Sequence, residues 1–132
     1  MFTHTKVCIY SMSDFNDIMN KNCMYIISEY GMKWAIYGRT KNIKRRFCQY
    51  LEIEKDALTF KYPVKITLYF GTNNEVMNLE TDVKRQLRKN KYDYLFVNNE
   101  RGNQVEFIPN KYVGKLVSLI NNHIKIENRL EY

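Results

Sequence analysis

The chain has 132 residues, of which 45% are hydrophobic and 27% are charged, a balance that predicts one soluble globular domain with its own core. No apolar run approaches the roughly 20 residues of a membrane-spanning helix, and no signal peptide is visible, so an intracellular protein is expected. The formal net charge of +7 favours a polyanionic partner such as nucleic acid, with plain solubility as the alternative explanation.

The chain is not expected to hold a structural zinc ion. The three cysteines, Cys8, Cys23 and Cys48, lack the close spacing of a zinc site. The two histidines, His4 and His123, supply no close pair of metal ligands either. Each cysteine is therefore expected to behave as a small buried apolar group in a reducing compartment.

The first 21 residues are interpreted as a lead-in that packs on the main domain. Residues 6–10 are expected to form a short strand, and Ser13 has the side chain of an N-cap for a short helix. The main domain is expected to span residues 22–122. The polar residues 123–132 are expected to form a frayed C-terminal tail.

The main domain begins with a predicted β-hairpin. Residues 23–29 and 33–37 are expected to form two antiparallel strands, with Gly31 free to adopt a positive φ in the turn between them. Gly38 follows the second strand, and it is expected to act as a structural turn that opens the next connection.

Beyond the hairpin, helices and strands alternate. Each helix is predicted from apolar residues at a spacing near 3.6, and the strands from apolar residues that alternate with others. This order predicts a mixed α/β (α+β) fold, in which a three-stranded sheet is flanked by helices and followed by an extra C-terminal helix. The expected elements are a helix capped by Thr40 or Asn42 and ending near Leu51, a strand at residues 64–70, turn and cap residues at 71–74, a helix at 75–89, a short strand at 105–108 and a helix at 109–122.

Two charged side chains occupy unusual positions on the predicted helices. Arg46 lies at the border of the apolar face, where a guanidinium either presents fixed donors to a phosphate or covers apolar surface. Glu80 lies within about 60° of Val76 and Val83 on the apolar stripe. Because an isolated carboxylate is costly to desolvate, Glu80 is expected to be paired or metal-bound. The simplest alternative is an ion pair with Lys84 at i,i+4.

Two triplets, an arginine and a glutamate follow one another along the chain. The triplets are Cys23-Met24-Tyr25 and Ile36-Tyr37-Gly38, with Arg46 in the next helix and Glu80 in a later one. Together they resemble the GIY-YIG nuclease superfamily, whose pattern is a Gly-Ile-Tyr strand, a Tyr-Ile-Gly strand, a helix with an arginine and a distal glutamate. The resemblance covers about residues 22–120.

Some positions depart from the family pattern. Ile36 stands where the family has the first tyrosine of the second triplet, and Tyr37 follows one place later. Adjacent strand residues face opposite sides, so Tyr37 is expected to reach the site only if the strand bulges or slips by one residue. Tyr50 stands where some relatives carry a histidine. A domain that binds nucleic acid but has lost the chemistry therefore stays open as an alternative.

The resemblance implies an endonuclease that hydrolyses phosphodiester bonds in DNA. One divalent cation, Mg²⁺ or Mn²⁺, would be held by Glu80, and Arg46 would hold the scissile phosphate. Tyr25, or Tyr37 if it turns inward, would take the proton from the attacking water. Basic side chains near the site are expected to follow the phosphate backbone, unless they are only a solvated helix face. The expected nucleic-acid-binding residues are Arg39, Lys41, Lys44, Arg45, Lys84 and Arg88.

No separate recognition module is predicted, so sequence preference is expected to be weak unless a partner or a homodimer supplies it. Branched DNA, single-stranded DNA and RNA stay open as substrates. The stretch Val105-Glu106-Phe107 is similar to the C-terminal part of small viral and phage members, which implies a viral protein acting in a host cytoplasm or nucleus. A protein-interaction domain with an incidental basic surface is the third hypothesis, and it predicts little salt dependence of DNA binding.

Overall fold

The computed structural model describes residues 2–18, 20–28, 34–52, 63–89, 95–98 and 104–130, and within them an antiparallel sheet separates two helical layers. The expected turn around Gly31 lies outside these residues. The mixed α+β class is confirmed. In chain order the elements are β1 (Thr3–Ile9), the 3-10 helix η1 (Met12–Phe15), β2 (Cys23–Ser28), β3 (Trp34–Thr40), α1 (Ile43–Glu52), β4 (Val64–Phe70), α2 (Asn73–Lys89), β5 (Leu95–Asn98), β6 (Gln104–Pro109), the 3-10 helix η2 (Asn110–Tyr112) and α3 (Val113–Leu130).

The sheet is wider than predicted. Its six strands within the described residues run in the order β1-β4-β2-β3-β6-β5, and the expected three-stranded unit β4-β2-β3 forms the centre. The lead-in strand β1 pairs with β4, from Thr3 opposite Phe70 to Ile9 opposite Val64. The prediction of three strands was wrong because pairing between distant segments leaves no mark in local periodicity, and because β5 was not predicted at all.

Strand β3 has one edge that is only partly covered. Strand β6 pairs with β3 at Trp34, Ala35 and Ile36, and no strand within the described residues pairs with that edge beyond Ile36. On its other side β3 stays paired with β2 as far as Thr40. We call the segment 37–40 the free edge of β3, meaning only that no described strand pairs with it on this side.

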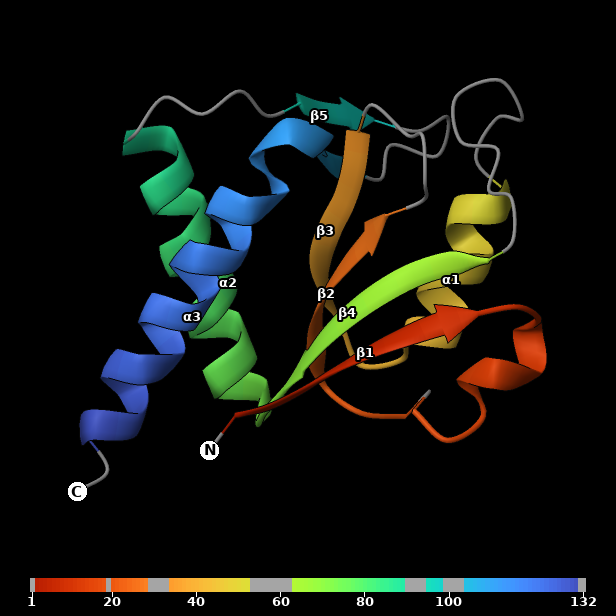
Figure 1. Cartoon of the computed structure of the whole chain (residues 1–132), viewed down its shortest axis with the longest axis horizontal. Helices are drawn as coiled ribbons and strands as arrows, with labels where there is room; N and C mark the ends of the chain where they lie inside the picture. Colours follow the sequence, from red (N-terminus) through yellow and green to blue (C-terminus); the bar gives the residue numbers. More distant parts are fainter. Residues whose placement is uncertain are drawn as a thin grey trace.

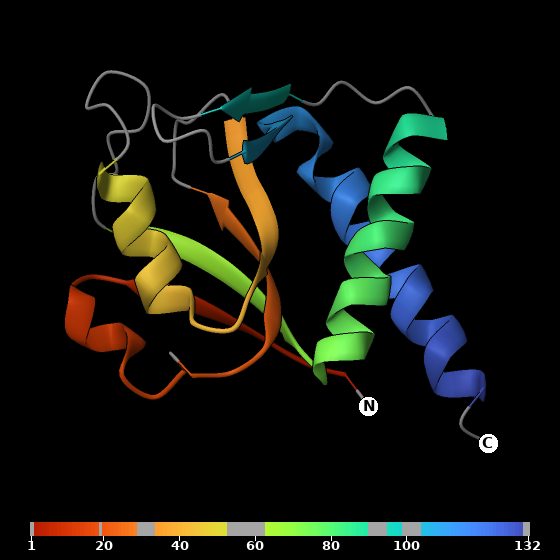
Figure 2. The ribbon, with the colours of Figure 1, turned by 180° about the vertical axis from the view of Figure 1, so that it is seen from behind.

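The sheet separates two hydrophobic cores. Helix α1 covers one face, and helices α2 and α3 cover the other (Figures 1 and 2). Alternate residues of each strand contribute to opposite cores, as strand geometry requires. The α1 core includes Tyr25, Ile27, Ile36, Phe47 and Leu68. The α2/α3 core includes Ile26, Tyr37, Tyr69, Leu79 and Leu116.

Gly38 lies inside β3 and is not a turn residue. It pairs with Tyr25 of β2, and a Cβ atom at this position would lie 2.8 Å from Oη of Tyr25. Glycine is therefore needed because the Tyr25 ring crosses the strand here. The strand continues to Thr40. Of the two expected caps, Thr40 and Asn42, it is Asn42 whose Oδ1 accepts a hydrogen bond of 3.0 Å from the backbone N–H of Arg45.

Both ends of the chain differ from expectation. The N-cap of η1 is Ser11 and not Ser13, because the Asp14 carboxylate accepts hydrogen bonds from the backbone of Tyr10 and Ser11. Residues 123–130 continue helix α3 and are not a frayed tail. These residues are mostly polar, so the sequence did not reveal that one face of this helix packs against α2.

The cysteines follow the prediction only in part. Cys23 is buried in β2 and Cys48 is half-buried on α1, but Cys8 is exposed. In the edge strand β1, Val7 and Ile9 turn toward the α1 core, so Cys8 between them faces outward.

Candidate active site

A pocket of about 360 Å³ lies at the free edge of β3. An edge is the one place where side chains from both faces of a sheet can reach the same space. The pocket is accordingly lined from two sides. Tyr25, Arg46 and Tyr50 reach it from the α1 side, whereas Tyr37, Arg39 and Glu80 reach it from the α2 side.

Tyr25 is held by its neighbours on the α1 side of the pocket. The side chain is buried, and its ring lies over Gly38. Its hydroxyl is hydrogen-bonded to the hydroxyl of Tyr50 on α1, and the two ring centroids are 6.2 Å apart. Tyr50 was not predicted as a site residue. Its signal was the spacing of one helical turn from Arg46.

Tyr37 reaches the pocket without the bulge that was expected to be necessary. The register between β2 and β3 is continuous, with Ile26 opposite Tyr37 and Ile27 opposite Ile36. Tyr37 therefore lies on the face opposite to Tyr25, as strand alternation requires. It still lines the pocket because the pocket lies at the strand edge and not on one face.

Arg46 and Arg45 are separated by helical geometry. Arg46 is half-buried and lines the pocket, whereas Arg45 is exposed and does not. Consecutive helical residues point about 100° apart, which places only one of the two guanidinium groups at the pocket. The position of Arg46 therefore suits a fixed contact with a phosphate in the pocket.

Glu80 is an ionic partner of two basic side chains. Its Oε1 atom lies 3.1 Å from Nε of Arg39 and 3.5 Å from Nζ of Lys84. Its side chain is only 14% exposed, so these contacts offset the cost of shielding the carboxylate from water. The ion pair with Lys84, predicted as the simplest alternative, is therefore present, together with a contact to Arg39 that was not predicted.

The pocket offers one carboxylate to a metal ion. Among the described residues, no three His, Cys, Asp or Glu side chains are grouped so that they could hold a cation. A zinc centre usually takes three or four such protein ligands. A single carboxylate beside a pocket open to water fits Mg²⁺ or Mn²⁺ better, because Mg²⁺ binds through one or two carboxylates and retains several waters.

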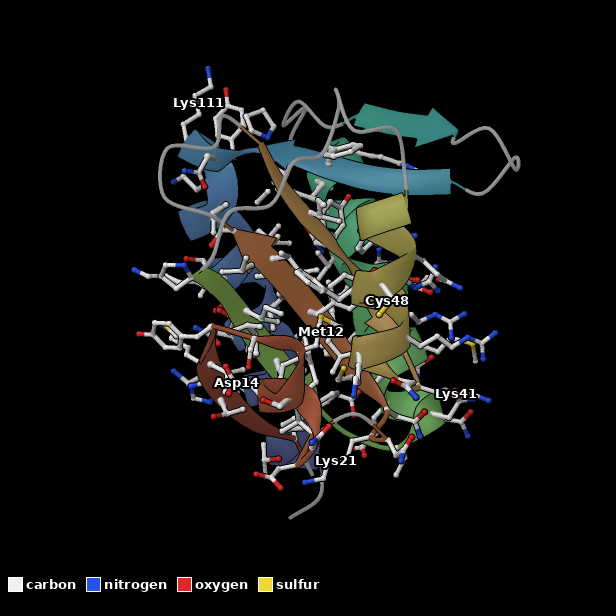
Figure 3. All side chains as sticks on the ribbon, turned by 90° about the vertical axis from the view of Figure 1, so that its right-hand side faces the viewer. Met12, Asp14, Lys21, Lys41, Cys48 and Lys111 are labelled. Carbon is white, nitrogen blue, oxygen red and sulfur yellow. The ribbon has the colours of Figure 1, made fainter. Side chains whose placement is uncertain are left out.

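The predicted nucleic-acid-binding residues fall into two groups. Arg39 and Lys41 line the pocket, and Figure 3 shows Lys41 beside the first turn of α1. Lys44, in contrast, donates a hydrogen bond of 3.2 Å to Oδ1 of Asn16 in the lead-in segment. Lys84 contacts Glu80 without lining the pocket, and the exposed residues Arg45 and Arg88 also lie outside the lining.

Two sets of contacts fix helix α2, which carries Glu80. At its start, Thr72 and Glu75 form a reciprocal capping box, with hydrogen bonds of 2.9 and 3.2 Å. The hydrogen bond from the Thr72 backbone lowers the pKa of the Glu75 carboxyl. Further along, Nδ1 of His123 on α3 lies 2.8 Å from Oδ2 of Asp82. These contacts hold both ends of the helical segment that presents Glu80.

Asp82 is a partly buried carboxylate with two hydrogen-bond donors. Burial raises its pKa, but hydrogen bonds from His123 and Arg85 outweigh this effect, so the pKa lies below its ordinary value. Asp82 is therefore a carboxylate that stabilises the fold in its ionised form, two residues after Glu80.

Comparisons of the chain with protein-family models, with curated proteins and with solved structures found no match. No helix in the described part of the chain combines the length and apolar character needed to cross a membrane. Functional interpretation therefore depends on the geometry and charge of the pocket.

Proposed function

We propose that this chain is a GIY-YIG-type endonuclease that hydrolyses phosphodiester bonds in DNA with the help of one divalent cation. The observation that carries the proposal is the presence of Tyr25, Arg46 and Glu80 in one pocket, although they come from three separate elements of the chain. A phenol, a guanidinium and a carboxylate at one open edge can supply a general base, a phosphate contact and a metal ligand for metal-assisted attack on a phosphodiester.

The charge of the pocket supports an anionic substrate. Three of its lining side chains, Arg39, Lys41 and Arg46, are cationic, and Glu80 is the one carboxylate in the lining of this described pocket. The pocket lies at the free edge of β3, where a long polymer such as DNA can reach it. The formal net charge of +7 adds a long-range attraction to polyanions.

In this proposal each residue takes the role that the resemblance to the GIY-YIG family implies. Arg46 binds the scissile phosphate and stabilises the negative charge that develops on it. Tyr25 accepts the proton of the attacking water, and Tyr50 stabilises the charge on the Tyr25 oxygen by donating a hydrogen bond to it. Glu80 is the residue that would hold Mg²⁺ or Mn²⁺, and the chemistry such a cation supplies is Lewis-acid stabilisation of the leaving oxygen.

The test measures cleavage of supercoiled plasmid, branched DNA and RNA in Mg²⁺, in Mn²⁺ and in EDTA. We expect nicking that requires a divalent cation and falls roughly 100-fold or more in Glu80→Gln, on the scale found for loss of a transition-state contact. Glu75→Gln is the matched control, because Glu75 lies on the same helix outside the pocket and glutamine also completes a capping box. The proposal fails if the wild type cleaves nothing, or if Glu80→Gln cleaves as fast as the wild type.

A second candidate function is a nucleic-acid-binding module without chemistry. Ile36 favours it, because this side chain is fully buried in the α1 core at the position where the family pattern has a tyrosine. This function predicts DNA binding that weakens steeply with salt and no cleavage in any metal. Fluorescence anisotropy with labelled DNA over a range of salt concentrations, run beside the plasmid assay, distinguishes the two candidates.

A further inference from the structure

The carboxylate of Glu80 is engaged by basic side chains of the chain itself. Arg39 Nε and Lys84 Nζ both contact the same oxygen atom, Oε1, at 3.1 and 3.5 Å. Positive charges this close to Glu80 repel any further cation that approaches it. A divalent cation that binds Oε1 therefore competes with these two side chains, and a cation at the other oxygen of the carboxylate would still lie close to both positive charges.

Arg39 is the side chain that can move and still remain in the pocket. It is 41% exposed, compared with 23% for Lys84, and it extends from the free edge of β3. Arg39 lines the pocket beside Lys41 and Arg46, whereas Lys84 does not line it. A guanidinium released from Glu80 therefore faces the space in which a phosphate group would bind.

We propose that Arg39 is the resident counter-ion of Glu80, and that it exchanges this carboxylate for a substrate phosphate when a divalent cation binds. The inference rests on the proposed function, in which Glu80 is the metal ligand. It makes metal binding and phosphate binding cooperative, because the cation takes the carboxylate and the phosphate takes the released guanidinium. Coupling of this kind is reciprocal, so DNA also strengthens metal binding.

The first experiment measures Mn²⁺ affinity by electron paramagnetic resonance of the free ion, without DNA. We expect Arg39→Gln to bind Mn²⁺ roughly two- to fivefold more tightly than the wild type, the effect of removing one exposed ion pair. Lys41→Gln is the matched control, because it removes the same charge from the same pocket. A gain for Arg39→Gln at least twofold larger than that for Lys41→Gln supports the exchange, and a gain no larger overturns it.

The second experiment measures the affinity for a short duplex DNA by fluorescence anisotropy, in Ca²⁺ and in EDTA. We expect Ca²⁺ to improve the affinity of the wild type at least twofold more than that of Arg39→Gln. Equal improvement in the two proteins overturns the transfer of Arg39 to a phosphate. Circular dichroism of each variant verifies that the fold is retained.

The outcomes separate this inference from the proposed function. If neither wild type nor Arg39→Gln binds Mn²⁺, the exchange and the metal-dependent function both fail. If the wild type binds Mn²⁺ and nicks plasmid, but Arg39→Gln binds Mn²⁺ no more tightly, only the exchange fails.

Discussion

The contact between Gly38 and Tyr25 can be tested with one added methyl group. A Cβ atom at Gly38 would lie 2.8 Å from Oη and 3.2 Å from Cζ of Tyr25, well inside the roughly 3.5–4.0 Å of an ordinary carbon contact. The substitution Gly38→Ala must therefore displace the Tyr25 ring. Because that ring is hydrogen-bonded to Tyr50, the displacement also disturbs the α1 side of the pocket.

The expected size of this effect follows from three contributions. Overpacking in a close-packed site costs roughly 1–3 kcal/mol. Loss of the hydrogen bond between Tyr25 and Tyr50 adds about 1 kcal/mol. Replacing a strand glycine by alanine returns roughly 0.5–1 kcal/mol through the unfolded chain. We therefore expect Gly38→Ala to lower the free energy of unfolding by about 1–3.5 kcal/mol, and the melting temperature by roughly 4–12 °C.

Thermal unfolding followed by circular dichroism measures this change, with Gly114→Ala as the matched control. Gly114 lies in α3, and apart from its chain neighbours and the adjacent helix backbone, no heavy atom of the described residues lies within 4 Å of a Cβ placed on it. Alanine at that position should leave stability unchanged or raise it by up to about 1 kcal/mol. The contrast between the two glycines therefore isolates the steric effect of the Tyr25 ring.

A double-mutant cycle with Tyr25→Phe tests the cause directly. Phenylalanine lacks the hydroxyl oxygen that makes the 2.8 Å contact. In the Tyr25→Phe background the penalty of Gly38→Ala should fall by about 1 kcal/mol, since the two residues are in direct contact. The proposed packing would be refuted if Gly38→Ala were as stable as the wild type. It would also be refuted if Gly38→Ala were as destabilising in the Tyr25→Phe protein as in the wild type.

Three further predictions concern the core, the contact between α2 and α3, and the thiols. Leu79→Ala should lower the free energy of unfolding, measured in urea, by about 3 kcal/mol, because the Leu79 side chain is fully buried. A decrease below about 1 kcal/mol would contradict the assigned core. Asp82→Asn should cost about 1 kcal/mol at pH 7. The pKa of Asp82 is lower in the folded than in the unfolded protein, so its ionised carboxylate stabilises the fold. This stabilisation is complete above the unfolded pKa of about 4 and disappears as the pH falls through the folded pKa. A destabilisation by Asp82→Asn that persists at pH 2 would argue against this role. At pH 8, Ellman's reagent should label the exposed Cys8 in the folded protein but Cys23 only after unfolding. Burial raises the pKa of the Cys23 thiol to about 12, so little reactive thiolate is present there. Rapid labelling of Cys23 in the folded protein would contradict its buried position.

Local periodicity predicted most of the helices and strands. The apolar stripe of α2, formed by Val76, Leu79, Val83 and Leu87, is buried at every position, and β4 has its predicted bounds of Val64–Phe70. These elements were predictable because one face of each is covered by a core, and this leaves a regular pattern in the sequence.

The pairing of strands was not predictable in the same way. The partner of β1 is β4, far along the chain, and nothing in residues 3–9 identifies it. Gly38 was assigned to a turn. Glycine occurs both where the backbone must turn and where another group packs closely against the backbone, and the residue type alone does not distinguish the two cases. Only the position of the Tyr25 ring shows that close approach is the reason.

The candidate site was predictable where helical geometry decides the outcome. That geometry places Arg46 at the border of the apolar face of its helix, with Arg45 about 100° away, and it singles out Glu80. Tyr37 was judged by its strand face, whereas the pocket lies at the strand edge and is lined from both faces. The contact from Arg39 to Glu80 joins a strand to a helix, and no spacing along the chain indicates it.

The most direct measurement compares the initial rates at which Arg46→Ala and Arg45→Ala nick supercoiled plasmid in Mg²⁺. The two arginines are neighbours on α1, and only Arg46 lines the pocket. We predict that Arg46→Ala loses roughly 100-fold or more in rate, whereas Arg45→Ala loses less than about threefold. Equal losses in the two variants, or a wild-type rate for Arg46→Ala, would contradict the assignment of catalysis to the pocket at the free edge of β3.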